Sequence, residues 1–217
     1  MDGLTTLKNM MIRDPRPAVM ISALTSGGAT VTFDAIKYGA VDFVPKPSRK
    51  SGGLDRQRKE IVRKISLAAR MDKSAIRLLR ASAGIGKAKA PRMEPPSQIV
   101  CIGAAEGGYG SLLKIITGLR PDLPAALLIV LYAEPAHVKA FASYLDAHSL
   151  ISVKRAKDKE SLSSGFCYLA SGDEYLTLEK QDGRFLSRLN PNPFRGRRGA
   201  VNMLMISTAE MFGKKAA

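Results

Sequence analysis

Hydrophobic and polar residues follow one another along the first part of the chain in a pattern that predicts two helices and two strands. Over 4–13, apolar residues recur at helical spacing from Leu4 to Met11 and would share one face. Asp14-Pro15 then ends this helix, because proline disfavours helical backbone in the residue before it. The segments that follow are a buried apolar strand over 18–24, a helix over 29–38 and a strand over 41–44. Helices and strands that alternate at such short spacing indicate parallel βα units.

The pattern changes after this region. Leu54 to Leu79 has apolar residues along one side and predicts a long basic helix. Residues 81–97 show no periodicity and are rich in Ala, Gly, Pro and Lys, so they predict a linker. Beyond the linker we expect strands over 98–103, 125–132, 152–156 and 165–171, helices from 108 to 119, over 136–148 and over 200–212, and a hairpin of 175–179 and 184–189 around Asp182-Gly183.

Length and composition limit the kind of protein that this chain can be. With 217 residues, of which 45% are hydrophobic, the chain can bury a core, and its length fits one large domain or two small ones. The longest apolar run, Ala125 to Ala133, is shorter than the ~20 residues that a membrane span needs, and the start lacks the basic segment of a signal peptide. We therefore expect a cytoplasmic protein without a membrane span. Cys101 and Cys167 lie in apolar runs, which predicts unpaired thiols in buried strands and neither a disulfide nor a metal site.

Positive charge is concentrated in one stretch. The formal net charge is +15, and Arg49 to Arg92 holds 14 Lys or Arg against three acids, Asp55, Glu60 and Asp72. Such a cluster can attract nucleic acid, acidic lipid or an acidic protein face, or it can be a solvated helix face with a charged linker. The stretch contains no aromatic residue, and base stacking is a common part of single-strand binding, so nucleic acid is not the expected partner.

Three short motifs resemble the second half of a response-regulator receiver domain. Met1-Asp2-Gly3-Leu4 is similar to the segment after the phosphorylated aspartate, Ser22 ends a strand where receivers keep Ser or Thr, and Lys46-Pro47 resembles their Lys-Pro pair. The resemblance implies phosphate-sensing roles for Ser22 and Lys46 and a cis Lys46-Pro47 bond. A hydroxyl and an ammonium at the carboxyl ends of neighbouring parallel strands would converge on a ligand there. The phosphoacceptor aspartate and the acidic pair for magnesium would lie upstream of Met1.

Three later motifs resemble the methylesterase domain of the bacterial chemotaxis response-regulator methylesterases. Residues 102–108, Ile-Gly-Ala-Ala-Glu-Gly-Gly, are similar to that family's Gly-Ala-Ser-Thr-Gly-Gly nucleophile turn. Residues 132–135, Tyr-Ala-Glu-Pro, fall where the family has His-Met-Pro-Pro, and 165–173 resembles its Gly-x-x-Tyr-Ile-Ala-Pro-Gly-Asp segment. With the linker and the domain order, the resemblance covers nearly the whole chain.

The resemblance also identifies what has changed at the implied catalytic positions. In the family a serine attacks the methyl ester of a receptor glutamate, a histidine takes its proton and an aspartate orients the histidine. The serine position is Ala105, which has no nucleophilic atom, and the histidine position is Tyr132, a poor base at neutral pH with an ordinary pKa of ~10. The aspartate segment would follow Gly213 and is expected beyond Ala217.

Other residues offer weak substitutes for this machinery. His137 is expected at a helix start, where the helix dipole disfavours its charged form, and both it and His148 are interpreted as surface residues. Glu106 beside Ala105 is interpreted as a solvated or capping carboxylate. The glycines of the 103–108 turn could open a phosphate-binding helix, but the sequence has neither a Gly-x-Gly-x-x-Gly nor a Gly-Lys-Ser/Thr motif there.

The sequence therefore predicts an α/β protein. We expect the C-terminal part of a receiver domain with a flavodoxin-like parallel sheet over 1–80, a linker over 81–97, and a truncated, doubly wound methylesterase-like domain over 98–217. The expected function is that of a non-catalytic homologue in chemotaxis signalling, with chemoreceptors or other chemotaxis proteins as partners and no cofactor. An active protein-glutamate methylesterase and a basic module that binds nucleic acid or acidic lipid through 49–92 are the alternatives.

Overall fold

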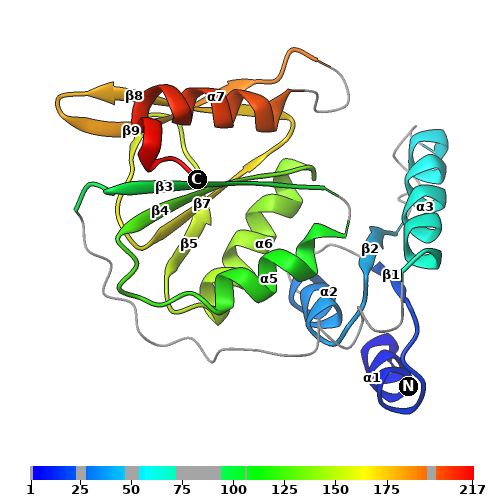
Figure 1. Cartoon of the computed structure of the whole chain (residues 1–217). Helices are drawn as coiled ribbons and strands as arrows, with labels where there is room; N and C mark the ends of the chain where they lie inside the picture. Colours follow the sequence, from blue (N-terminus) through cyan, green and yellow to red (C-terminus); the bar gives the residue numbers. More distant parts are fainter. Residues whose placement is uncertain (1, 23–27, 47–53, 72–93, 106, 195–198) are drawn as a thin grey trace. The chain divides into compact units, whose positions relative to one another are not determined.

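The computed structural model describes residues 2–22, 28–46, 54–71, 94–105, 107–194 and 199–217 (Figure 1). The chain divides into two compact units. The first comprises Met1–Ala83 with Glu106–Ile115, and the second comprises Gly84–Ala105 with Ile116–Ala217. The domain boundaries expected from the sequence stay a prediction, because most of the linker over 81–97 lies outside the described residues.

The first unit alternates helices and strands. In chain order it contains α1 (Gly3–Arg13), β1 (Val19–Ser22), α2 (Gly28–Lys37), β2 (Asp42–Pro45) and α3 (Leu54–Ala69). β1 and β2 pair in parallel, with Val19 opposite Asp42 and Ser22 opposite Pro45. The parallel βα arrangement predicted for this region is confirmed.

Aromatic side chains form the centre of the first unit. Leu7 and Met11 of α1 are buried, as are Phe33 of α2 and Phe43 of β2, whose rings meet edge to face with centroids 5.8 Å apart. Tyr109 of α5 (Gly108–Thr117) lies beside them, and its ring centroid is 6.0 Å from that of Phe33 and 5.0 Å from that of Phe43. These separations are those of favourable aromatic pairs, so the cluster contributes both buried area and preferred ring geometry.

Both ends of α1 follow from local chemistry. The Asp2 carboxylate accepts a hydrogen bond from the Thr5 backbone N–H at 2.8 Å, which satisfies a donor that the first helical turn leaves open. At the other end the Asp14 backbone N–H donates to the Met10 carbonyl, and the helix stops before Pro15. The predicted helix over 4–13 and its stop signal are confirmed.

The second unit is built on a four-stranded parallel sheet. Its order is β3 (Gln98–Ala104), β4 (Ala125–Leu131), β7 (Phe166–Ser171) and β5 (Ser152–Arg155). All residues of β4 are buried, as expected for a central parallel strand that is covered on both faces. α6 (Pro135–His148) packs against β5 and β7.

An antiparallel layer completes the second unit. β6 (Glu160–Ser161), β9 (Arg184–Pro191) and β8 (Glu174–Gln181) pair in that order. The hairpin predicted around Asp182-Gly183 is present as β8–β9, and both residues have positive φ, 50° and 74°, which is the backbone of a primed turn. α7 (Ala200–Phe212) packs against β8, β3 and β4 (Figure 1), and its Leu204 enters the core shared by these elements.

Three details differ from the expected elements. The helix predicted over 54–79 ends at Ala69, and its final hydrogen bonds, from Arg70 to Leu67 and from Met71 to Ala68, are the short i to i−3 type that tightens a helix end. The continuous helix is therefore wrong at residues 70–71, and residues 72–79 lie outside the described part. β6 and a short 3₁₀ turn, Gly213–Lys215, were not predicted.

Candidate functional site

The turn after β3 carries Ala105. β3 ends at Ala104, Ala105 is exposed, and α5 (Gly108–Thr117) begins after Gly107, whose φ of +77° lies in the left-handed region that favours glycine. A strand and a helix are thus present on either side of the segment where the sequence predicts a tight turn. Glu106 lies outside the described residues, so its expected role as a solvated or capping carboxylate stays a prediction.

Tyr132 lies beside this turn. Ala104 pairs with Leu131 in the parallel register, and the Tyr132 backbone N–H donates to the Ala104 carbonyl at 2.8 Å. The residues that follow, Ala105 and Tyr132, are therefore at the carboxyl ends of neighbouring strands, the edge where α/β sheets place their ligands. The Tyr132 ring is half-buried and packs against the core of the second unit.

Ser171 is the last residue of β7, which pairs with β4, so it lies at the same edge of the sheet. The sequence did not predict a role for it. Its hydroxyl donates to the Ala133 carbonyl at 2.6 Å and accepts from the Asp173 backbone N–H at 3.1 Å. The side chain is fully buried. Ser171 is therefore a structural link between the ends of β4 and β7, and its hydroxyl is not accessible to an ester. The sequence feature that could have identified Ser171 is its position between a buried strand and the turn residues Gly172-Asp173.

The two histidines lie on α6. His137 is half-buried in the first turn of the helix. His148 is the last helical residue, where its Nδ1 lies 2.8 Å from the Tyr144 carbonyl and its ring stacks on Tyr144 with centroids 4.2 Å apart. α6 has 14 residues, so His148 is about 20 Å along the axis from the end next to Tyr132. His148 is too distant to act as a base at Ala105.

Neither cysteine is activated as a nucleophile. Cys101 in β3 is half-buried and its sulfur lies 3.2 Å from the Thr208 hydroxyl, while Cys167 in β7 is fully buried. Burial raises the pKa of both thiols above the ordinary value of 9.0. Because the thiolate is the reactive form, both side chains behave as neutral core residues near neutral pH. The predicted placement in strands is confirmed, with Cys101 less buried than expected.

The structure brings Ser22 and Lys46 together through the backbone. The Lys46 N–H donates to the Ser22 carbonyl at 2.8 Å, at the carboxyl ends of β2 and β1. The Ser22 hydroxyl accepts a hydrogen bond from the Thr32 hydroxyl at 2.9 Å, and Lys46 is exposed. Their phosphate-sensing role stays a prediction. The expected cis bond includes Pro47, which lies outside the described residues.

Two properties of the described residues concern metal binding and membrane insertion. No group of three or more His, Cys, Asp or Glu among them could hold a metal ion. Likewise, no helix in the described part of the chain is long and apolar enough to cross a membrane.

Comparison with known proteins agrees with this geometry. The family model described as CheB methylesterase matches residues 100–217. The protein-glutamate methylesterase/protein-glutamine glutaminase of Pyrococcus horikoshii is 39% identical over 223 residues, covering 99% of this chain and 60% of the relative. The protein-glutamate methylesterase/protein-glutamine glutaminase 1 of Hahella chejuensis is 34% identical over 225 residues, covering 100% of this chain and 62% of that relative. This chain therefore spans about 60% of the length of these relatives.

A solved structure gives the same answer for the fold. The crystal structure of the Thermotoga maritima CheB methylesterase catalytic domain is similar, with a TM-score of 0.52 and 35% identity over 55% of this chain and 64% of that chain. This likeness confirms the doubly wound α/β fold class that the sequence predicts. The chain belongs to the CheB methylesterase family.

Proposed function

We propose that this chain is a non-catalytic member of the CheB methylesterase family that acts by binding other proteins of the chemotaxis system. Ala105 carries the proposal. It is exposed on the turn between β3 and α5, at the position where the family motif has its serine, and a methyl group cannot form an acyl-enzyme. In a hydrolase with a serine triad, loss of the serine lowers kcat on the order of a million-fold.

The neighbouring groups that the structure describes support the same proposal, because none of them supplies a replacement nucleophile. Tyr132 occupies the motif position of the histidine, and a phenol is a poor general base at neutral pH. The Ser171 hydroxyl is buried and donates to Ala133. Both thiols have raised pKa values, which disfavours their reactive form.

The first unit fits the C-terminal part of a receiver domain. Its support is the parallel β1–β2 pair with Ser22 and Lys46 at the carboxyl ends. In this proposal residues 1–80 are the receiver part, 81–97 the linker and 98–217 the methylesterase-like part. Chemoreceptors or other chemotaxis signalling proteins are the proposed partners, as the resemblance to the chemotaxis response-regulator methylesterases implies. The relatives' names, which give protein glutamate and glutamine as the groups acted on, are compatible with a protein partner.

The second candidate function is the activity in the relatives' names, protein-glutamate methylesterase. Its support is the identity of 39% to the Pyrococcus horikoshii protein over nearly the whole chain. The two candidates differ in one measurable quantity, the release of methanol from a methylated receptor.

The deciding experiment incubates the full chain with a methylated chemoreceptor fragment and follows methanol, with the Pyrococcus horikoshii protein as positive control. We expect the background rate from this chain and retained binding to the immobilised receptor fragment. Methanol release that increases in proportion to the chain's concentration would establish the second candidate. Absence of both methanol release and receptor binding would refute the proposed partner while leaving the loss of catalysis in place.

A further inference from the structure

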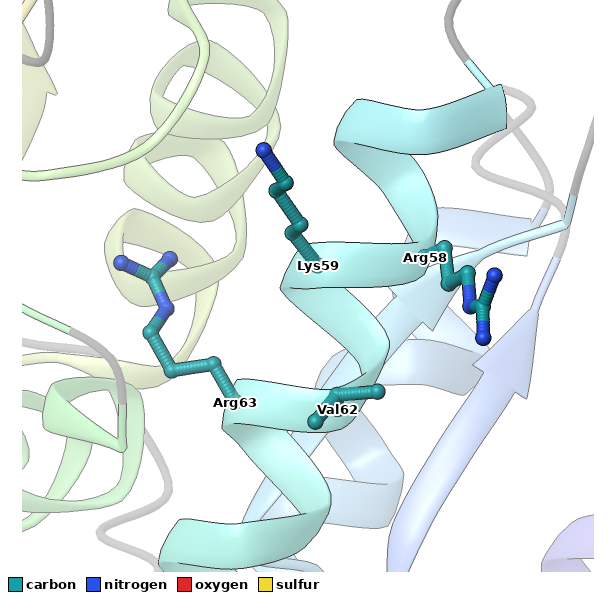
Figure 2. Close-up of a pocket in the computed structure, with 4 residues that line it drawn as sticks. All are labelled: Arg58, Lys59, Val62 and Arg63. Carbon is teal, nitrogen blue, oxygen red and sulfur yellow. The ribbon is translucent and has the colours of Figure 1, made fainter.

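We draw no further inference here: the strongest candidate, the surface hollow on α3 that Arg58, Lys59, Val62 and Arg63 line (Figure 2), carries none, because nothing in the described part of the structure shows what covers it.

Discussion

The Asp42 carboxylate accepts a hydrogen bond from the Gly107 backbone N–H, with 3.1 Å between Oδ2 and N. Its other oxygen accepts from the Phe43 N–H at 2.7 Å and lies 3.4 Å from the Lys64 ammonium, which also donates to the Phe43 carbonyl. Asp42 and Lys64 are almost fully buried, with side chains 1% and 7% exposed. This network links β2, α3 and the residue that precedes α5 within the first unit.

Removing the cation from this network should destabilise the first unit. Lys64→Met leaves the Asp42 carboxylate buried without its ammonium partner, and breaking such a buried pair costs about 3 to 5 kcal/mol. Lys59→Met, which removes an exposed cation from the same helix, should change the free energy of unfolding by less than about 0.5 kcal/mol. Chemical denaturation of both variants checks this, and similar losses in the two would show that the buried pair contributes nothing specific.

The same carboxyl group should make stability depend on pH. Burial raises the pKa of Asp42 above its ordinary value of 3.8, although Lys64 and the hydrogen bonds from Phe43 and Gly107 act to lower it. The folded chain therefore keeps this proton to a higher pH than the unfolded chain. Its contribution is fully present below pH 3.8 and is lost as pH rises through the folded pKa. The free energy of unfolding, measured by chemical denaturation at a series of pH values, should fall with rising pH for the wild type more than for Asp42→Asn. An identical pH dependence of the two proteins would contradict the raised pKa.

Most of the fold was accessible from periodicity, and the exceptions have physical causes. The helix over 200–212 was predicted to the residue, because its apolar spacing is clear and glycines flank it at 199 and 213. β6 was missed because Glu160 and Ser161 are polar and carry no pattern. They form a strand only by pairing with Ser187 and Leu186 of β9, which is a tertiary effect.

The candidate site was predictable where it depended on strand order and unpredictable where it depended on side-chain direction. Parallel strands bring their carboxyl ends together, so the proximity of Ala105 and Tyr132 follows from the sequence. The Ser171 bond to Ala133 does not, because it requires the rotamer of a buried hydroxyl. Lys64 looked like one more solvated cation of the basic stretch, and only the packing of α3 on β2 buries it.

Close packing at Gly103 should make β3 sensitive to one methyl group. A Cβ at this position would lie 2.8 Å from both Val201 methyl groups of α7. Gly103→Ala should therefore destabilise the second unit by about 1 to 3 kcal/mol through overpacking. Val201→Ala in the same chain should recover part of the loss, and the double-mutant cycle measures the coupling. Additive effects of the two substitutions would show that these residues do not meet.

Restoring a serine should not restore hydrolysis. Ala105→Ser introduces a hydroxyl at an exposed position, so the variant should fold with an unchanged unfolding midpoint. Without a base at Tyr132 the hydroxyl stays weakly nucleophilic, because triad members act as a unit. Methanol release from a methylated receptor should remain at background for this variant, and adding Tyr132→His should increase it more than either change alone. Substantial release by Ala105→Ser alone would reveal a base that the geometry has not identified.

The two parallel sheets should differ in how readily they open. β4 is buried along its whole length and pairs on both sides, with β3 and with β7. Within the described part of the chain, β1 pairs only with β2 in a two-stranded sheet, and its Ile21 is 59% exposed. Opening free energy follows buried apolar contacts, so amides of β1 should exchange at least about a hundredfold faster than those of β4, a difference of about 3 kcal/mol. Hydrogen exchange followed by mass spectrometry resolves both strands, and limited proteolysis should cut residues 1–80 before 98–190. Slow, cooperative exchange throughout 1–80 would instead identify the first unit as a stable domain in its own right.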